Sequence, residues 1–233
     1  MNYVPRHEPY AHQAEALKRM ADKPAFALLM EMRTGKTKVI LDEWGMLQQV
    51  GQMDDLLVVA PAGVYKTWVE AAAIHWSADL AASALIHVFE SGAGVKVKKE
   101  RCAFMETITV PRLLLVNVEA LSSVLAAREL CLKFLAQRRC ALVIDESVII
   151  KNPSAKRTRF IVKLLAPLAK MKRILSGLPT PRSPLDLFSQ FEFLDPKIIG
   201  IRSYYAFRAR YAIMKTQQFG GRWVPLVVGY RDI

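Results

Sequence analysis

The stretch AFALLMEMRTGKTK, residues 25–38, decides the fold of this chain. Residues 25–30 are apolar and too few for a helix, which indicates a short buried strand. A loop follows, and an apolar pattern of helical spacing starts near residue 36. In such a loop the backbone N–H groups and the positive end of the helix dipole point to the same place. The sequence therefore predicts a phosphate-binding loop between a strand and a helix.

Two side chains of this loop suit a nucleotide with its magnesium ion. Lys36 would reach the β- and γ-phosphates, and the hydroxyl of Thr37 would bind Mg²⁺. The pattern G-x-x-x-x-G-K-[ST] is met only in part, because Met30 and Arg33 stand where glycine is common. A bare Gly-Lys-Thr triplet often occurs by chance, so the prediction depends on the strand and the helix that flank it.

A pair of acids, Asp145 and Glu146, ends a second apolar run at residues 141–144. Two carboxylates at the tip of a buried strand cost free energy unless an ion or a substrate uses them. In phosphate-loop ATPases the acid at this position holds Mg²⁺, here Asp145, and Glu146 would polarise the attacking water. An ordinary solvated strand end is the alternative, and the phosphate loop upstream argues against it.

Short apolar runs alternate with helix-like stretches along most of the chain. The runs lie at 25–30, 56–60, 84–89, 113–118, 141–144 and 173–175, and the helix-like stretches at 10–20, 36–50, 63–76, 96–107, 119–138 and 154–169. Several runs are apolar on both faces, as strands inside a parallel sheet are. The alternation predicts an α/β fold, a mainly parallel sheet with helices on both faces.

The chain changes character after Pro196. Residues 202–210 predict a basic, aromatic helix, and residues 212–230 predict a hairpin that turns at a pair of glycines. We therefore expect one main domain, residues 1–196, and an appendage, residues 197–233, that closes it.

The composition points to a polyanionic partner. The chain has 33 Lys and Arg against 21 Asp and Glu, a net charge of +12. Nucleic acid is the first candidate partner, and an anionic membrane surface is the second. No apolar window reaches the roughly 18 residues of a membrane span, and the N-terminus has no apolar stretch suited to export. We therefore expect a soluble, cytoplasmic protein with no membrane partner. The three cysteines cannot all pair and show no zinc-site spacing, so we expect reduced thiols.

The order of the motifs resembles the first RecA-like lobe of helicase superfamily two, in its Swi/Snf-type branch of DNA-dependent ATPases. EMRTGKT at 31–37 is similar to motif I of that family, and DESVIIKNPSAKRTR at 145–159 is similar to its DEAH-type box. Four further segments match in order: YAHQ at 10–13, VVAPAGVYKTWVEA at 58–71, VNVEAL at 116–121 and SGLPTPRSPLDLFSQFEFLDP at 176–196. The resemblance covers nearly the whole chain and is greatest to compact bacterial and bacteriophage members.

The resemblance implies an enzyme that hydrolyses ATP with Mg²⁺ and moves on duplex DNA. It implies catalytic roles for Lys36, Asp145 and Glu146, and magnesium binding by Thr37 and Asp145. The ATP-binding residues carried over are Tyr10, Gln13, Arg33, Thr34, Gly35, Lys36, Thr37 and Lys38. The DNA-binding residues are Lys66, Thr67, Lys151, Asn152, Lys156 and Arg157, and Ser176, Gly177 and Pro179 would couple hydrolysis to movement.

The chain also departs from the family pattern. Ser147 and Val148 replace the usual Ala-His after the two acids, and Leu178 interrupts the usual Ser/Thr-Gly-Thr-Pro. Family members carry a second RecA-like lobe with an arginine finger worth about 10³–10⁵ in rate, and no such segment follows Ile233. We expect that lobe in cis or in trans, and weak hydrolysis by this chain alone. The alternative is a non-catalytic DNA- or protein-binding module.

A cationic strip is expected beside the nucleotide site. Between residues 138 and 173 there are ten Lys or Arg, and the acids there are Asp145 and Glu146. Such a strip suits contacts to the phosphates of a nucleic acid. For Lys163 and Lys170 a solvated helix face is the alternative.

Three features leave two interpretations open. Trp68 and Trp76 favour core packing over base stacking. The tail aromatics Tyr204, Tyr205, Phe207 and Tyr211 alternate with arginines, which fits either packing onto the lobe or a platform for DNA. The segment at 91–100, Gly-rich and then basic, predicts either a mobile excursion or the solvated start of a helix.

Overall fold

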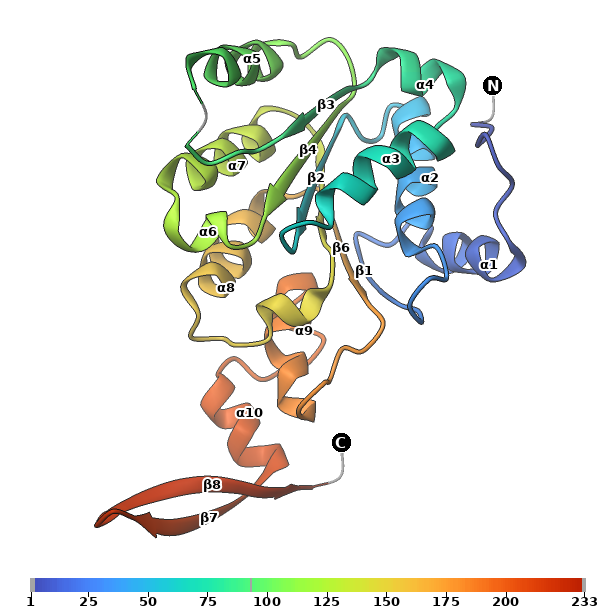
Figure 1. Ribbon diagram of the computed structural model, residues 1–233. Helices are drawn as coiled ribbons and strands as arrows, with labels where there is room; N and C mark the ends of the chain where they lie inside the picture. Colours follow the sequence, from blue (N-terminus) through green and yellow to red (C-terminus); the bar gives the residue numbers. More distant parts are fainter. Residues whose placement is uncertain (1–2, 93, 232–233) are drawn as a thin grey trace.

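A six-stranded sheet forms the centre of the molecule (Figure 1). The structure is a computed structural model that describes residues 3–92 and 94–231. The strands are β1 (Ala25–Leu29), β2 (Asp55–Ala60), β3 (Leu85–Val88), β4 (Arg112–Asn117), β5 (Cys140–Ile144) and β6 (Met171–Ser176). Their order is β1-β6-β5-β2-β4-β3, and all five neighbouring pairs are parallel. The six predicted strands and the parallel α/β fold are confirmed.

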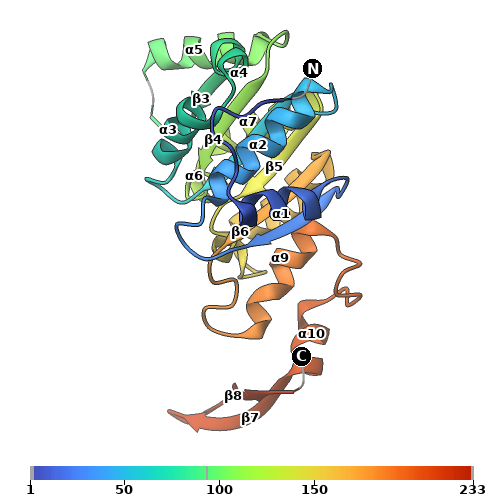
Figure 2. The same ribbon diagram turned by 90° about the vertical axis from the view of Figure 1, so that its right-hand side faces the viewer.

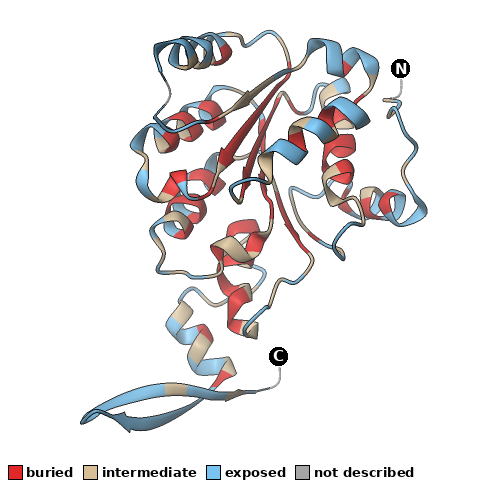
Figure 3. Ribbon diagram, viewed as in Figure 1, coloured by how far each residue is buried: buried red, intermediate tan, exposed pale blue. Residues whose placement is uncertain are grey.

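Helices cover both faces of the sheet (Figure 2). On one face lie α1 (Ala11–Met20), α2 (Lys36–Gln49), α3 (Tyr65–His75) and α4 (Ala78–Ser83), and on the other α5 (Val95–Glu106), α6 (Ala120–Ser123), α7 (Leu125–Gln137), α8 (Lys156–Phe160) and α9 (Leu187–Leu194). Side chains of β2 alternate between the faces. Val58 packs in the apolar cluster under α1 to α4, and Leu57 and Val59 pack in the cluster under α5 to α9. Figure 3 shows the buried residues on the strands and on the inner sides of the helices. The central strands are therefore apolar on both faces, as the sequence indicated.

Two expected helices are interrupted in the structure. The stretch at 119–138 divides at Val124, whose backbone is extended, into α6 and α7. The stretch at 154–169 continues from α8 into a wider π-turn at Ile161–Leu165 and a tight 3-10 turn at Ala166–Leu168. Pro167 explains this ending, because it lacks the N–H that a regular α-helix would need there. The sequence patterns did not predict α4 or α9.

The tail forms α10 (Tyr204–Tyr211) and a hairpin of β7 (Ala212–Phe219) and β8 (Arg222–Tyr230). The hairpin turns at Gly220 and Gly221, whose φ values of 53° and 79° are those that a two-residue hairpin loop requires. Phe207 is buried in a small cluster with Phe188 of α9, whereas Tyr205 is 73% exposed. The hairpin extends away from the sheet (Figures 1 and 2). Helix α10 and Ala212 at the start of β7 therefore pack on the main domain, which supports the packing interpretation for Phe207.

The other open interpretations are also decided. Trp68 and Trp76 are buried, so both belong to the core. Helix α5 begins at Val95, so the Gly-rich segment before it leads into a helix start, while residue 93 lies outside the described residues. Cys131 and Cys140 are buried and Cys102 is exposed, all three as free thiols. In the described part of the chain, no helix has the length and apolar character needed to cross a membrane.

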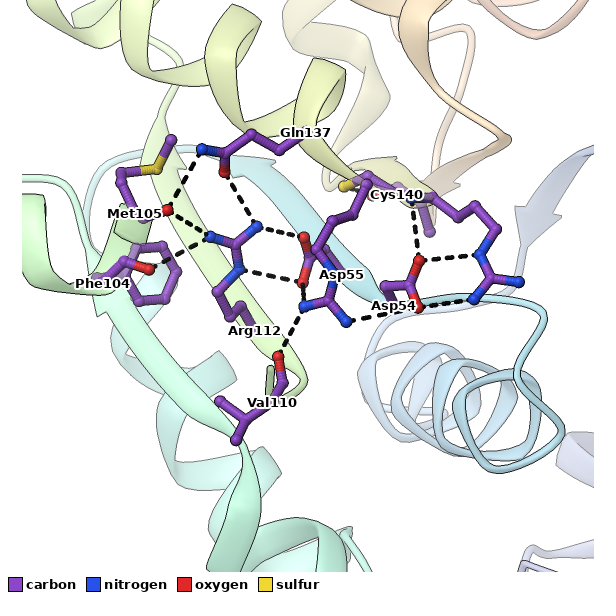
Figure 4. Close-up of polar contacts among 11 residues, drawn as sticks. Asp54, Asp55, Phe104, Met105, Val110, Arg112, Gln137 and Cys140 are labelled. Carbon is purple, nitrogen blue, oxygen red and sulfur yellow. Dashed lines mark hydrogen bonds and ion pairs between the residues drawn. The ribbon is translucent and has the colours of Figure 1, made fainter. Parts of the chain in front are cut away.

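A buried ion-pair network lies at the amino ends of β2 and β4 and joins them (Figure 4). The guanidinium of Arg112 lies 2.6 Å from a carboxylate oxygen of Asp55, and both side chains are fully buried. Arg112 also donates to the carbonyls of Phe104 and Met105. Arg138 donates to the other Asp55 oxygen at 3.1 Å. Burial raises the pKa of Asp55, and the neighbouring guanidinium groups oppose that rise.

Candidate nucleotide site

The carboxyl edge of the sheet brings two distant segments to one cavity. Its volume is about 340 Å³, and it is lined by Met32, Arg33, Gly35, Lys36, Thr37, Val64, Asp145 and Glu146. The first five residues follow β1 and the last two follow β5, with β6 between these strands. Loops that follow parallel strands leave the same edge of a sheet, which is where α/β proteins bind ligands. The phosphate loop and the acid pair therefore meet, although about a hundred residues separate them.

The phosphate loop ends where α2 begins. Gly35 is the N-cap of α2 and has a left-handed backbone, with φ of 82°. The ammonium of Lys36 donates to the carbonyls of Met30 and Glu31 at 3.0 Å each, which holds it inside the loop. The first turn of α2 borders the cavity, so the positive end of the helix dipole favours an anion there.

Arg33 occupies a backbone conformation that suits glycine. Its φ is 64°, in the left-handed region, and its side chain is exposed at the cavity. For a residue with a Cβ atom this conformation costs free energy. The structure thus explains why glycine is common at this position of the loop, and why arginine there is a departure.

We expect Arg33→Gly to raise the free energy of unfolding by about 1 kcal/mol, because glycine adopts the left-handed conformation without steric cost. Urea denaturation measures the change. Arg33→Ala is the control, since it removes the guanidinium but keeps the Cβ, and it should leave stability nearly unchanged. Equal stabilisation by both variants would show that charge, and not backbone strain, is the cause.

Helix α1 supports the phosphate loop from outside. Gln13 is 3% exposed, and its amide donates to the carbonyl of Thr34 at 3.0 Å. Its side-chain oxygen accepts the backbone N–H of Tyr10 at 3.0 Å. A Cβ on Gly35 would lie 2.3 Å from the Gln13 amide nitrogen, so that position requires glycine. The structure therefore brings Gln13 to the loop, with its amide engaged by protein groups, whereas Tyr10 bonds to Gln13 and is 72% exposed.

Lys38 is a correction to the predicted ATP-binding set. It lies one turn into α2, and it is not among the residues that line the cavity. Its ammonium is buried and pairs with the carboxylate of Asp42 on the same helix. The side chain points into the protein because positions separated by four residues share one face of a helix.

The acid pair has the burial and the backbone geometry of a functional site. Asp145 is 6% exposed, and burial raises its pKa, although N–H groups from Trp68 and Glu146 and the charge of Lys36 oppose the rise. Burial also raises the pKa of Glu146, and the charge of Asp145 adds to the effect. Glu146 has a φ of 49°, a strained value for a non-glycine residue. The arrangement holds two carboxylates at one cavity with Lys36 as the cation that offsets their charge.

The donor set fits a magnesium ion. Mg²⁺ prefers oxygen ligands and keeps several of its waters. The hydroxyl-bearing Thr37 and the carboxylate of Asp145 line the same cavity, which also has room for a phosphate chain. Thr37 and Asp145 are therefore the residues that would hold the ion.

The loop after β6 contacts both parts of the site. A Cβ on Gly177 would lie 3.2 Å from the Met32 side chain, so this loop packs closely on the phosphate loop. The hydroxyl of Ser147, next to the acid pair, donates to the side-chain oxygen of Gln190. The Gln190 amide in turn donates to the carbonyl of Pro179 at 2.8 Å. Ser176 is buried at the end of β6. The predicted coupling residues thus lie between the two halves of the site.

The predicted DNA-binding residues lie after two neighbouring strands. Lys66 and Thr67 are exposed at the start of α3, which follows β2. Asn152 and Lys156 are exposed and Lys151 is half-buried, in the segment after β5, the strand that pairs with β2. Both segments leave the carboxyl edge, so they can face one polymer.

Arg157 is a partial correction to that set. Its Nε donates to the carbonyl of Ile149 at 3.0 Å, which fixes the side chain against the turn that follows the acid pair. The bond gives Arg157 a structural role, and the sequence pattern could not separate this role from a contact with DNA.

The expected cationic strip is not continuous. Arg139 pairs with Asp54, and Arg138 pairs with both Asp54 and Asp55 at the amino end of β2. Arg173 is buried and pairs with Glu43 of α2 at 2.6 Å. The prediction was wrong for these arginines, because their partners come from distant parts of the sequence. Lys163 likewise pairs with Glu192, on an exposed surface.

A larger cavity, about 640 Å³, lies elsewhere. Its lining includes the apolar side chains of Leu17, Met46 and Met171, and two of its charged residues, Glu43 and Arg173, pair with each other. We assign the nucleotide to the smaller cavity, because the phosphate loop and the acid pair line that one.

Two residues of the site were missed as functional candidates. The indole N–H of Trp68 donates to Asp145, and Gln190 links the acid loop to the loop after β6. Both residues lie in segments that the motifs identify, but the sequence favoured core packing for Trp68 and assigned no role to Gln190. The departure at Ser147 was the one signal that pointed toward Gln190.

Comparison with known proteins agrees with the motif order. The sequence model of the SNF2-related domain matches residues 12–220. A Drosophila melanogaster protein, SWI/SNF-related matrix-associated actin-dependent regulator of chromatin subfamily A-like protein 1, is 38% identical over 87 residues, 37% of this chain and 11% of the relative. The TATA-binding protein-associated factor mot1 of Aspergillus fumigatus is 40% identical over 63 residues, 27% of this chain and 3% of that protein. The chain thus spans about a tenth or less of these relatives.

Solved structures confirm the RecA-like fold. The SWI2/SNF2 ATPase core of Sulfolobus solfataricus in complex with dsDNA matches with a TM-score of 0.69 and 21% identity, over 91% of this chain and 40% of that one. The UvsW helicase of bacteriophage T4 matches with a TM-score of 0.54 and 14% identity, over 81% and 58%. The sequence relatives are eukaryotic, so a bacterial or phage type stays a prediction. Because the family match spans most of the chain and its motifs line one cavity, this chain belongs to the SNF2-related domain family.

Proposed function

We propose that this chain is the ATP-binding lobe of a DNA-dependent ATPase that couples ATP hydrolysis to movement on duplex DNA. The observation that carries the proposal is the single cavity lined by Lys36 and Thr37 together with Asp145 and Glu146. Phosphoryl transfer to water needs a cation at the phosphates, a metal site and a group that orients the water, and these four residues supply them. Membership in the SNF2-related domain family supports the same reaction.

Each residue has one role in this reaction. Lys36 offsets the charge that develops on the γ-phosphate. Thr37 and Asp145 would hold Mg²⁺, which would neutralise charge on the phosphate oxygens. Glu146 accepts a hydrogen bond from the attacking water. The raised pKa of Glu146 makes it a better proton acceptor than an exposed glutamate, provided that it is ionised at neutral pH.

Duplex DNA is the polymer that we propose for the carboxyl edge of the sheet. The similar Sulfolobus core was solved in complex with dsDNA. The net charge of +12 and the exposed Lys66 and Lys156 fit contacts to phosphate. Such contacts position a strand without reading its bases, so binding should depend little on sequence.

We propose further that a second RecA-like lobe, in cis or in trans, completes the site. This chain covers 40% of the Sulfolobus core, a share that fits one lobe of a larger machine. We place the protein in the cytoplasm, associated with nucleic acid, in a bacterium or a phage-infected cell. We expect weak activity from this lobe when it is assayed alone, because the family's arginine finger lies on the second lobe.

A charge-matched pair of variants tests the DNA surface. We expect Lys66→Glu/Lys156→Glu to weaken duplex binding and to lower the slope of log affinity against log salt by about 2, because two phosphate contacts are lost. Lys98→Glu/Lys99→Glu, on the exposed face of α5, changes the net charge equally and is the control. Fluorescence anisotropy over a salt series measures both. Equal slopes for the two variants would exclude the proposed surface.

A non-catalytic DNA- or protein-binding module is the second candidate. Leu178 favours it, because this 58% exposed leucine stands where the family pattern has threonine, in the loop after β6. Such a module would bind duplex DNA with an affinity that ATP does not change, and it would show no turnover.

A further inference from the structure

We infer that Trp68 is a positioning residue for the proposed magnesium ligand Asp145. The inference rests on the proposed function, in which the Asp145 carboxylate binds Mg²⁺. The indole N–H of Trp68 donates to Oδ2 of Asp145 at 2.8 Å, although 77 positions separate the two residues. Trp68 lies on α3 and Asp145 follows β5, so the bond joins two segments that the sequence alone does not connect.

Neutral N–H groups hold the carboxylate on both sides. Oδ1 of Asp145 accepts the backbone N–H of Glu146 at 2.9 Å, and Oδ2 accepts the indole. Among residues 3–92 and 94–231, no Lys, Arg or His forms an ion pair with Asp145. Each carboxylate oxygen has two lone pairs, so both bonds leave acceptor capacity for a metal ion. The two N–H groups therefore fix the orientation of the carboxylate without occupying it.

The indole is itself held rigidly. Trp68 is fully buried in the apolar cluster between the sheet and helices α2 and α3. Protein interiors are close-packed, so the ring cannot rotate without displacing its neighbours. A rigid donor on a metal ligand sets the ligand's orientation, and losing such a partner typically lowers metal affinity by about 10–100-fold.

Core packing alone does not account for this bond. Trp76 ends the same helix, and Trp44 lies on α2; both are buried in the same cluster. In the described residues their indole nitrogens have no hydrogen-bond partner. The core therefore accepts tryptophan without using its N–H, and Trp68 differs from these two residues by its bond to Asp145.

Nucleotide affinity with and without Mg²⁺ tests the inference on the full chain. Trp68→Phe keeps an aromatic ring and removes the N–H. The ratio of the ADP Kd in EDTA to the ADP Kd in Mg²⁺ measures how much the ion strengthens binding. We expect Trp68→Phe to lower this ratio by about tenfold or more, or to 1 if the whole magnesium effect is smaller than that. The Kd in EDTA should stay unchanged. Trp76→Phe removes the same atoms from the same core and should leave the ratio unchanged. Isothermal titration calorimetry gives both constants.

The outcomes separate the two proposals. Magnesium-dependent binding that Trp68→Phe leaves intact, or that Trp76→Phe reduces equally, would overturn the positioning role alone. Absence of nucleotide binding by the unchanged chain would overturn the proposed function, and the positioning role with it.

A second measurement uses the unchanged sequence, in case Trp68→Phe does not fold. Indole ¹H–¹⁵N resonances are assigned with Trp44→Phe, Trp76→Phe and Trp223→Phe, which leaves Trp68. Adding Mg²⁺ to the ADP-bound protein should shift the Trp68 resonance and leave those of Trp44 and Trp76 in place. An unmoved Trp68 resonance, with Mg²⁺-dependent ADP affinity established, would contradict the inference.

Discussion

Replacing Glu146 with glutamine is expected to lower the rate of ATP hydrolysis by about 10²–10⁴-fold, the usual contribution of a positioned proton acceptor. Glutamine keeps the shape of the side chain but cannot take a proton from the attacking water. Glu146 lines the cavity beside Asp145, at the edge where the phosphate loop ends. Nucleotide affinity should remain close to that of the unchanged chain, because Lys36 and Thr37 still bind the phosphates.

Single-turnover hydrolysis in saturating duplex DNA measures the effect, since it detects slow reactions. Two further variants serve as controls. Glu119→Gln, at an exposed position outside the cavity, should hydrolyse ATP normally. Lys36→Ala should instead lose nucleotide binding, because the ammonium inside the phosphate loop is gone. Normal turnover in Glu146→Gln together with normal affinity in Lys36→Ala would exclude the ATPase assignment. Nucleotide-independent DNA binding without turnover in any form would favour the binding module.

Replacing Asp55 with alanine is expected to lower the free energy of unfolding by about 3–5 kcal/mol. The change leaves the guanidinium of Arg112 fully buried without its carboxylate partner, and it also removes one partner of Arg138 (Figure 4). An uncompensated buried charge is far more costly than the loss of an exposed ion pair. Urea denaturation at constant pH measures the difference.

The neighbouring residue provides the control. Asp54 pairs with Arg139, whose side chain is 51% exposed, so Asp54→Ala should cost about 1 kcal/mol or less. Adding Arg112→Met to Asp55→Ala should recover part of the lost stability, because it removes the unpaired charge. A cost for Asp55→Ala as small as that of Asp54→Ala would contradict the buried network.

Local patterns identified most of the fold. A strand inside a parallel sheet is apolar on both faces, so β2, β4 and β5 were visible as continuous apolar runs. Helices α1, α2, α3, α5 and α7 were predicted from their apolar patterns, but the stretch before Pro167 was not predicted to widen into a π-turn. The short helix α9 was missed because its buried residues include the polar Ser189 and Gln190, so apolar residues alone do not mark its buried face.

The candidate site divides in the same way. Lys36, Thr37, Asp145 and Glu146 were identified because each follows a strand in a recognisable pattern, and sequence order alone predicts which edge they share. The pairing of Arg138, Arg139 and Arg173 with acids was not identified, because charge counted along a chain does not show which cations face solvent. Lys38 was misplaced because a match to a sequence motif does not show which side of the following helix faces the cavity.

The amino-acid sequence by itself determined the α/β architecture, the phosphate loop and the acid pair, since these depend on apolar periodicity and on short contiguous motifs. Only the tertiary structure decided how the site is held: the Trp68 indole on Asp145, the Ser147–Gln190 bond and the left-handed backbones of Arg33 and Glu146. The physical reason is that a hydrogen bond depends on distance and direction to within a few tenths of an ångström. Residues far apart in the chain reach that geometry only when the packed core fixes them.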